Sequence, residues 1–531
     1  MQQKNSDQST FTYQTRIKHN ECTDEVLSCF AILMGKVERY VFAEFAKGRS
    51  ISSLKSFCLQ RFSITARHFN SIRVTLEGKI ASSKEGQKNR LKNLGYQIAS
   101  LEKTIQKLQK KKDVDFILHQ KKRRLACLRS RAGSIENDLK NGIVHLCFGS
   151  KKLFHEQFDL SANGYSSHEE WKKEWRSARS KNIFLLGSKD ETGGNQSATA
   201  LIQEDGLISL RIRLPDALSH FGKYHVLSDL YFAYGHEQIV NAIRQCLERK
   251  KDGTSGVAIS YRLFRDKKGW RIFVSVPTLK PKSASQNGIG VIGIDINSDH
   301  IAVVETDRFG NPFSHRRLPL VTYGKTHHQA KAHIGDVVKE IVSWGYSTTK
   351  PLVIEELSFE KKKQELRETG APRYSRMLSS FAYGAFISGL RSRGFRFGVE
   401  VKEVNPAFTS IIGRAKFSKR YGLSIHESAA LCIGRRFLGV SENLPRFFGA
   451  IADGKGGFVA LPLPVRNRGE HVWSAWRRVK KKLPAVLAAH FRAQSMRSSG
   501  LSTCCDTKKV LDFVSEILTR EPTTALLGCR V

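Results

Sequence analysis

The sequence predicts an α+β protein of several domains: a helical N-terminal region, a β-rich middle and a C-terminal half that mixes strands and helices. Three observations predict this class: the length of 531 residues, a heptad pattern of apolar residues between Leu91 and Leu139, and short apolar strands after Val291. At roughly 150 residues per domain, the length indicates about three or four domains. The apolar content of 40% is sufficient for packed cores.

The charge of the chain indicates a polyanionic partner. Lys and Arg number 88 and Asp and Glu 49, which gives a formal net charge of +39. Such a charge repels itself in a compact protein, so nucleic acid is the natural partner and a purely small-molecule enzyme is disfavoured. The chain has no run of about 18 apolar residues, no apolar secretory segment and no C-x-x-C pair among its ten cysteines. We therefore expect a cytoplasmic protein with reduced thiols, no membrane partner and no zinc.

A short strand and a long helical region open the chain. Residues Phe11 to Ile17 alternate like a strand, and a helix-rich stretch follows from about Cys22 to Phe158. Two heptad seams lie within that stretch: Leu91, Leu94, Ile98, Leu101, Ile105 and Leu108, and then Leu118, Leu125, Leu128, Ala132, Ile135 and Leu139. Two seams joined by a short acidic turn predict an antiparallel helical hairpin.

The polar faces of this predicted hairpin carry mostly one sign of charge. From Lys84 to Arg131 there are 15 Lys or Arg and 4 Asp or Glu. Mixed charges would serve solubility alone, so we favour contact with a nucleic-acid backbone, and a solvated face is the alternative. The candidate binding residues are Lys110, Lys111, Lys112, Lys121, Lys122, Arg123 and Arg124.

The middle of the chain changes to a strand pattern. Leu207 to Leu214 alternates, and the runs Ala258 to Phe264 and Trp270 to Val276 predict a hairpin around Asp266-Lys267-Lys268-Gly269. A Pro-, Ser- and Gly-containing linker over residues 281–288 then ends a small β-domain.

The C-terminal half has the element order of a ribonuclease-H-like fold. Strands are expected at Val291 to Ile296, Ile301 to Thr306 and Phe313 to Leu318, then a helix over His327 to Trp344, then a strand at Leu352 to Ile354. Three strands in hairpin order, a helix and a further strand that ends in an acid are typical of that fold.

Two acids at strand ends are the candidate catalytic residues. Asp295 and Glu355 each end an apolar run, where an unpaired carboxylate is unfavourable to bury. On adjacent strands they can hold Mg²⁺, and metal ions support phosphodiester hydrolysis. The alternative is two ordinary salt bridges. A third ligand is expected on a helix beginning near Ile425, where His426 or Glu427 is available, although successive helical residues do not face the same way.

These blocks resemble the TnpB-related (transposon OrfB) nucleases, relatives of type V CRISPR effectors. Residues 293–296 are similar to the first RuvC motif and residues 353–357 to the second. Residues 404–410 are similar to the stretch before the family's zinc ribbon, and residues 426–430 to the third motif. The upstream segment Cys147 to Phe154, CFGSKKLF, also looks like a segment of these proteins.

The resemblance implies three parts. Residues 1–20 and 181–285 form a small β-barrel wedge domain, residues 21–180 a helical recognition lobe, and residues 286–531 a RuvC-like nuclease domain with a basic C-terminal region. It further implies guide RNA and target DNA as partners, within a prokaryotic cell and at the nucleoid when DNA is bound. The implied function is RNA-guided DNA cleavage by divalent-metal-dependent hydrolysis, with Mg²⁺ or Mn²⁺ held by Asp295, Glu355 and His426.

Two departures from the family pattern leave alternatives open. The cysteines of the family's zinc ribbon are absent here, which indicates that the ribbon is deleted, and His426 stands where the family has an aspartate. Imidazole suits Mg²⁺ less well than carboxylate does. Cleavage with Mn²⁺ or a recruited neighbour, Glu427, Glu403 or Asp299, is one expectation. A weakened or inactive RNA-guided DNA-binding protein is another, a DNA-joining transposase is a third, and His426 itself has a purely structural alternative.

A second basic stretch follows the third motif. Trp473 and Trp476 precede a run of cations, and aromatic and basic residues together suit single-stranded nucleic acid. The tryptophans have a core helix as an equal alternative, whereas phosphate contact is favoured for the cations. The candidate binding residues are Arg477, Arg478, Lys480, Lys481 and Lys482.

Overall fold

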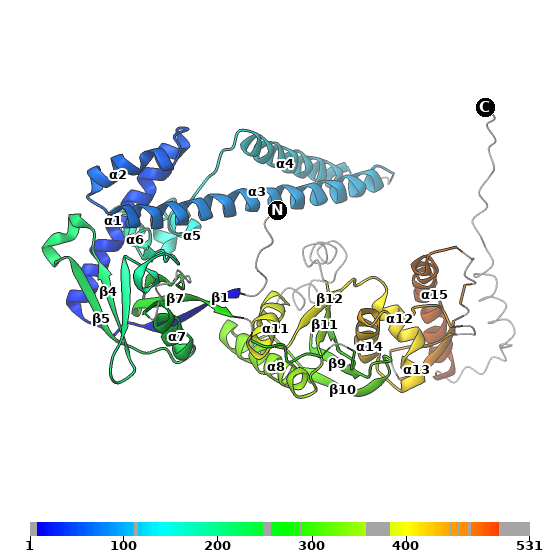
Figure 1. Ribbon diagram of the computed structural model, residues 1–531. Coiled ribbons are helices and arrows are strands. Elements are labelled where there is room, and N and C mark those ends of the chain that lie inside the picture. The colour runs from blue at the N-terminus through cyan, green and yellow to red at the C-terminus, as the bar shows by residue number, and fades with distance from the viewer. Residues whose placement is uncertain are drawn as a thin grey trace, which may run out of the picture. The chain divides into compact units, whose positions relative to one another are not determined.

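The computed structural model describes residues 8–110, 115–247, 256–279, 281–286, 288–356, 383–445, 449–454, 456–461, 463–464 and 469–498. The chain divides into two compact units, residues 1–279 and 280–531 (Figure 1). Of the predicted basic residues, Lys111 and Lys112 lie outside the described ranges. Within those ranges, no helix has the length and apolar character needed to cross a membrane.

The first unit combines helices with two β-sheets. Its elements are β1 (Gln8–Arg16), α1 (Glu21–Ala46), α2 (Lys55–Phe62), α3 (Ala66–Gln109), α4 (Asp115–Lys140), α5 (Lys151–Glu156), α6 (His168–Ala178), β2 (Asn182–Leu185), β3 (Ala198–Ile202), β4 (Ile208–Arg213), β5 (Tyr224–Leu230), α7 (His236–Leu247), β6 (Ser260–Asp266) and β7 (Gly269–Leu279). One hydrophobic core joins helices and sheets, because Phe30 of α1, Leu76 of α3, Ile183 of β2 and Leu210 of β4 belong to the same buried cluster.

The predicted strands are present, but the described residues do not show the predicted β-barrel. The strands form two separate sheets, β1-β7-β6-β2 and β3-β4-β5, and no barrel closes among the described residues. β1 pairs antiparallel with β7, so the N-terminal strand does join the middle β-region. Beyond β2 the Asn195 side chain donates to the carbonyls of Leu185, at 3.1 Å, and Ile259, at 2.9 Å. These two carbonyls therefore accept hydrogen bonds from a side chain and not from a further strand. The chain then continues into the second sheet.

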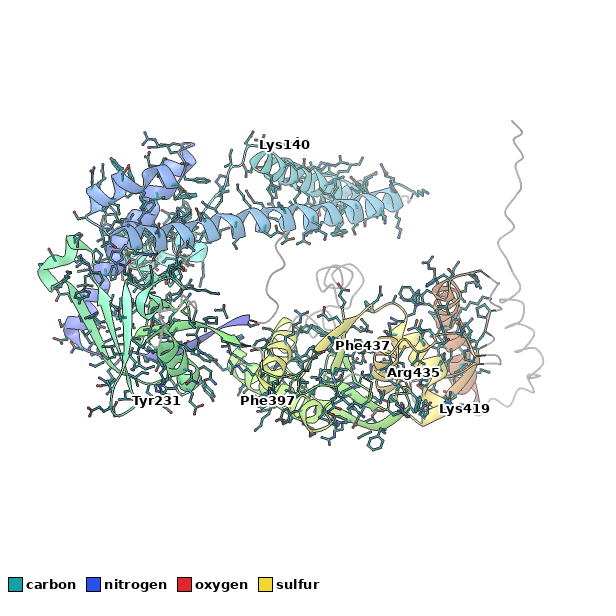
Figure 2. All side chains as sticks on the ribbon, in the orientation of Figure 1. Lys140, Tyr231, Phe397, Lys419, Arg435 and Phe437 are labelled. Atoms are coloured by element: carbon teal, nitrogen blue, oxygen red, sulfur yellow. The ribbon has the colours of Figure 1, made fainter. Side chains whose placement is uncertain are left out.

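The predicted helical hairpin is confirmed. Helices α3 and α4 pack together through a buried seam that contains Leu94, Leu128 and Ile135. The polar side chains stand out along both helices, and Lys140 ends α4 (Figure 2). The heptad spacing found the seam because residues three and four apart share one face of a helix.

The second unit is built on a five-stranded sheet. Its elements are β8 (Ile292–Ile296), β9 (His300–Thr306), β10 (Pro312–Pro319), α8 (His327–Ser347), β11 (Leu352–Glu355), α11 (Tyr383–Phe397), β12 (Val401–Val404), α12 (Thr409–Lys416), α13 (Ser418–Tyr421), α14 (Ile425–Phe437), β13 (Gly449–Ala452), β14 (Phe458–Leu461) and α15 (Val472–Ser498). The sheet order is β10-β9-β8-β11-β12. β8, β9 and β10 are antiparallel neighbours, whereas β11 is parallel to both β8 and β12. The predicted ribonuclease-H-like strand order is thus confirmed.

Helices cover both faces of this sheet. On one face Ile292, Ile294 and Leu352 pack with α8 and α11. On the other face Val291 and Val353 pack with Ile433 of α14. Because side chains alternate along a strand, Asp295 and Glu355 share the α14 face with Val291 and Val353.

Candidate active site

The register of two central strands brings Asp295 and Glu355 together. β8 and β11 are parallel, with Ile292 opposite Leu352 and Gly293 opposite Val353. Continued two residues along the chain, the same register places Asp295 beside Glu355 at the carboxyl ends of both strands. Two carboxylates that were predicted from separate apolar runs therefore lie side by side on one face of the sheet.

A glycine sets how closely α14 approaches this edge. A Cβ on Gly293 would lie 2.0 Å from the carbonyl oxygen of Ala430, so only glycine lets the helix lie directly on β8. Gly434, one turn further, packs on Val291 in the same way. Since residues four apart share a helix face, the turn before Ala430 brings His426 to Asp295. Helix and strand run in opposite directions, and His426 lies above the carboxyl end of β8.

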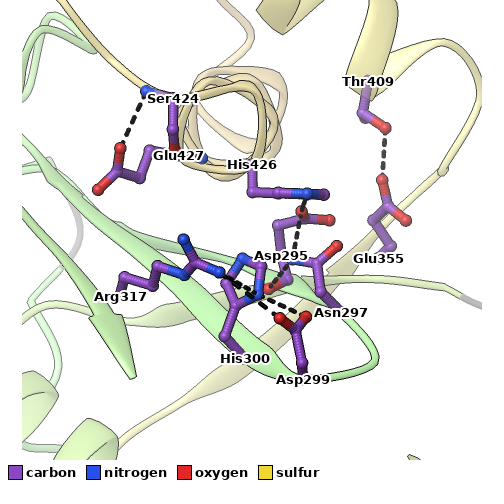
Figure 3. A network of polar contacts seen from close by, with 10 residues as sticks. All are labelled: Asp295, Asn297, Asp299, His300, Arg317, Glu355, Thr409, Ser424, His426 and Glu427. Carbon is purple, nitrogen blue, oxygen red and sulfur yellow. Dashed lines mark hydrogen bonds and ion pairs between the residues drawn. The ribbon is translucent and has the colours of Figure 1, made fainter. Parts of the chain in front are cut away.

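His426 binds the Asp295 carboxylate directly. Its Nδ1 lies 3.2 Å from Asp295 Oδ2, and the Asn297 amide nitrogen donates to the same oxygen at 3.0 Å (Figure 3). The Asp295 side chain is 13% exposed and that of His426 is 47% exposed. The buried ring of His300 meets the His426 ring edge-on, with centroids 4.8 Å apart. One carboxylate is thus held by an amide and an imidazole that a second imidazole supports.

A charged group stands behind this imidazole pair. His300 Nδ1 lies 2.8 Å from Asp299 Oδ1, and an Arg317 guanidinium nitrogen lies 3.5 Å from Asp299 Oδ2. Burial raises the pKa of Asp299, but the His300 hydrogen bond and the charges of His300 and Arg317 outweigh it, so the net pKa lies below its ordinary value. Asp299 thereby orients His300 rather than facing Glu355 (Figure 3).

Glu355 is held by a residue that sequence reasoning did not single out. The Thr409 hydroxyl, in the first turn of α12, donates to Glu355 Oε1 (Figure 3). Thr409 reaches this position because Asn405 Oδ1 accepts from the Ala407 amide and Phe408 takes a left-handed backbone, with φ of +63°. The stretch of residues 404–410, noted only for its resemblance, therefore forms the turn that places the Thr409 hydroxyl beside Glu355.

Glu427 does not face the two carboxylates. Its side chain accepts from the Ser424 amide in a capping box and lies 2.7 Å from His315 Nδ1. It points away from Asp295 in Figure 3. Burial raises its pKa, but hydrogen bonds from Ser424 and His315 bring the net pKa below the ordinary value. Glu403, on β12, forms an ion pair with Arg391 of α11. Glu427 instead fixes the first turn of α14, and so the position of His426.

The donor set fits a divalent cation through two carboxylates. Among the described residues, no group of three or more His, Cys, Asp or Glu is placed to hold a metal ion. Mg²⁺ in proteins is usually bound by one or two carboxylates, with water and substrate phosphates as the remaining ligands. Asp295 and Glu355 fit that pattern, and His426 would add an imidazole, which suits transition metals better than Mg²⁺.

The predicted nucleic-acid-binding residues fall into paired and unpaired groups. On the hairpin, Lys121 is half-buried on α4, Lys110 and the other described candidates are exposed, and no ion pair is recorded for these within the described ranges. On α15, Arg478 forms a two-pronged ion pair with Glu470, at 2.5 and 2.9 Å. Arg477, Lys480 and Lys481 are exposed, and Lys482 is half-buried.

The two tryptophans before this run pack against one hydrophobic core. Trp476 is fully buried and donates to the Glu442 carbonyl, and Trp473 donates to the Glu442 carboxylate at 2.9 Å. Trp473 also lies against Phe408 and beneath the Arg436 guanidinium. The core alternative is therefore correct for Trp476, whereas Trp473 is half-buried at the edge of the same core.

Comparisons with known proteins find similarity among solved structures. No family model and no curated protein matches the chain. A Cas12f1–sgRNA–target DNA complex is 11% identical, with a TM-score of 0.33, covering 80% of this chain and 99% of that one. A Cas12i–crRNA–dsDNA complex is 9% identical, with a TM-score of 0.28 and coverages of 68% and 60%. T. thermophilus RuvC with a Holliday junction is 15% identical, with a TM-score of 0.20 and coverages of 28% and 90%. All three are complexes with nucleic acid.

Proposed function

We propose that this chain is an RNA-guided DNA endonuclease of the TnpB-like type that cleaves target DNA by divalent-metal-dependent phosphodiester hydrolysis. The observation that carries the proposal is the pair of carboxylates, Asp295 and Glu355, at the ends of adjacent parallel strands beneath α14. The net charge of +39 and the basic hairpin support a large polyanionic partner.

Each residue at the site has a separate task in this mechanism. A divalent cation bound there would supply the Lewis acid that polarises the scissile phosphodiester. Asp295 and Glu355 would hold it, and Asn297 and Thr409 fix the orientation of their oxygens. His426 lies beside Asp295, where its neutral form offers a nitrogen ligand and its protonated form cancels the charge of that carboxylate.

The rest of the chain is assigned to the nucleic acids. Residues 21–180 act as the recognition lobe, residues 1–20 and 181–285 as the β-region beside it, and residues 286–531 as the nuclease domain. Exposed cations of α4 and α15 contact phosphates of a guide RNA and of its paired target. Base pairing then reads the target sequence, and the protein reads only a short adjacent motif.

One observation favours a second function, an RNA-guided DNA-binding protein that does not cut. The His426 imidazole already contacts one of the two Asp295 carboxylate oxygens, at 3.2 Å, and so competes with a cation for that carboxylate. A histidine in place of a third acid also makes the site less negative, which weakens its attraction for a divalent cation. In this form the chain would block a target instead of cleaving it.

Sequencing the RNA that co-purifies with the chain tests the class. We expect a discrete RNA with one variable end, and random cellular RNA would contradict guide-directed action. With that RNA and a matched target, we expect cleavage in Mg²⁺ or Mn²⁺ that Asp295→Ala abolishes while the RNA remains bound. Asp336→Ala, at an exposed acid of α8, is the matched control and should cut like wild type. Full protection of the target in both metals favours the second function, and equal cutting by Asp295→Ala rules out the assigned site.

A further inference from the structure

A large cavity in the first unit has no part in the proposed cleavage. Its volume is about 760 Å³, and it lies between α1, α3, α5 and the β2–β6 edge of the first sheet. That volume is in the range of ligand pockets, roughly 300–1,000 Å³. Four of its lining residues, Cys147, Phe148, Gly149 and Lys151, come from the CFGSKKLF segment that the sequence singled out.

The segment has a conformation that depends on its glycine. Gly149 has a φ of +108°, and a Cβ there would lie 3.0 Å from the Trp175 ring. Ser150 then caps α5, because its hydroxyl accepts from the Leu153 amide. The turn at Gly149 and the cap at Ser150 therefore place Phe148 and Lys151 on the cavity wall as well as starting α5.

The cavity wall is strongly basic. Its lining cations are Lys79, Lys151, Arg179, Lys181 and Arg262. Glu38 is the only acid among the described residues that line it, and its carboxylate already binds Lys79 at 2.6 Å. Burial lowers the pKa of Arg179, with a further contribution from Arg176. The other four cations have no acid on the described wall to balance them, and such an excess of positive charge on a concave wall is suited to bind an anion.

Two polar atoms at the wall lack a partner. Arg179 Nε and Asn182 Oδ1 are buried and have no hydrogen bond. A buried polar atom without a partner destabilises the fold, so such an atom in a native protein indicates a bound water, ion or ligand. One is a donor and the other an acceptor, so a ligand with both acceptor and donor groups satisfies the pair.

Aromatic rings complete the wall. Phe148 lies under Lys79 Nζ, 5.3 Å from the ring centroid, and Phe184 lies under the Arg262 guanidinium at 5.2 Å. Both rings line the cavity, together with Phe264. Rings interleaved with cations are the combination that holds an unstacked base and its phosphate.

We propose that this cavity binds one unpaired nucleotide of RNA, with Lys151 and Arg179 at the phosphate, Asn182 at a base edge and a phenylalanine ring against the base. RNA is favoured over DNA because a folded RNA has unpaired loop nucleotides, whereas duplex DNA keeps its bases stacked. The inference rests on the proposed function only in taking RNA as a partner of the first unit.

Binding of short single strands to the full-length chain, freed of RNA by nuclease and high salt, tests this site. The probes are fluorescein-labelled RNA pentamers rA5, rU5, rC5 and rG5 and their DNA counterparts, followed by anisotropy. We expect one RNA pentamer to bind in preference to the others. Lys151→Ala should weaken it about fivefold, the loss of one charged phosphate contact. Lys152→Ala removes the same charge from the next residue, which is exposed and outside the cavity, and should change the Kd less than twofold.

A second variant examines base reading without removing a cation. Asn182→Leu keeps a similar side-chain volume and removes the amide oxygen that would accept from the base edge, so the preferred pentamer should change or lose its advantage. Equal effects of Lys151→Ala and Lys152→Ala, or no base preference in wild type, overturn the proposal. If the DNA pentamers bind more tightly than the RNA pentamers, the ligand of the cavity is DNA and the proposal is wrong. If no pentamer binds, the cavity holds only water and the proposal is also wrong.

These measurements use neither guide, target nor cleavage. Pentamer binding with the expected variant effects, but no guided cleavage, would reject the proposed function and retain the nucleotide site. Guided cleavage that is unchanged by Lys151→Ala and Asn182→Leu, with no pentamer preference, would reject the nucleotide site and retain the proposed function.

Discussion

The His426 imidazole lies against the Asp295 carboxylate, with Nδ1 3.2 Å from Oδ2, at the position where the resemblance leads one to expect a third acid. Helix α14 brings them together because Gly293 leaves no side chain between the helix and β8. Because of this contact, His426 can act on a bound cation in two opposed ways: as a ligand that strengthens binding, or as a positive charge that weakens it. Substitution of His426 distinguishes the two.

Replacing His426 with an acid should strengthen metal binding. We expect His426→Asp to raise the affinity for Mg²⁺ about tenfold, because a third negative charge replaces a group that pairs with Asp295. Calorimetric titration of Mg²⁺ and Mn²⁺ without DNA measures this directly. His333→Asp, the same change at an exposed position of α8, serves as the control and should leave the titration unchanged. Weaker Mg²⁺ binding by His426→Asp would mean that the imidazole is itself the better ligand.

The sequence was sufficient to predict where the two acids lie, but not which residues orient their side chains. Asp295 and Glu355 were found because a carboxylate ending an apolar run is a local anomaly, and the strand order then placed them side by side. The role of Thr409 was not found, because a threonine five residues after the end of β12 carries no signal until the turn at Phe408 is known. The barrel was implied by the resemblance alone, and the described strands form two separate sheets. Closure of a barrel depends on pairing between distant edge strands, which the alternation of residues within one strand does not encode.

The close approach of α14 to β8 makes Gly293 sensitive to substitution. Gly293→Ala places a Cβ 2.0 Å from a backbone oxygen, so the helix must move away. We expect a loss of about 1–3 kcal/mol in unfolding free energy, typical of overpacking, and a loss of cleavage as His426 leaves Asp295. Urea denaturation and a cleavage assay measure the two effects. Gly335→Ala on α8, where a Cβ meets open space, should instead be neutral or stabilising.

The Thr409 hydroxyl should matter for the site more than for the fold. Thr409→Val keeps the shape and removes the donor to Glu355 Oε1. A hydrogen bond to a charged group contributes about 1.5–3 kcal/mol, so we expect metal affinity and cleavage rate to fall about tenfold or more. Thr409→Ser retains the hydroxyl and should stay within about threefold of wild type. If both variants behave alike, the methyl group's packing rather than the hydroxyl is responsible.

Exposed cations of the hairpin should contribute to RNA affinity, whereas Arg478 of α15, which is paired with an acid, should not. Lys122 and Arg123 are exposed on α4, and Arg478 on α15 is already bound by Glu470. Each phosphate contact contributes about 0.7–0.9 to the slope of log K against log salt. We expect the double variant Lys122→Ala/Arg123→Ala to lower that slope by about 1.5, and Arg478→Ala to leave it nearly unchanged. Filter binding of the co-purified RNA at four salt concentrations gives the slopes, and an equal slope for both variants contradicts the assignment.

A buried histidine in the first unit should make the fold acid-sensitive. Burial lowers the pKa of His68 to about 4, while its Nε2 pairs with the Arg213 carbonyl at 3.1 Å. The folded state keeps the ring neutral, and the unfolded chain takes up a proton near its ordinary pKa of about 6.5. Between these values the unfolded state binds more protons, so this stabilisation is complete above about pH 6.5 and is lost as the pH falls towards 4. The loss is on the order of 3 kcal/mol. Urea denaturation of wild type and His68→Gln across pH 4–7.5 isolates this contribution: the difference between the two proteins should shrink with acid, and a difference that is constant with pH would contradict the buried neutral ring.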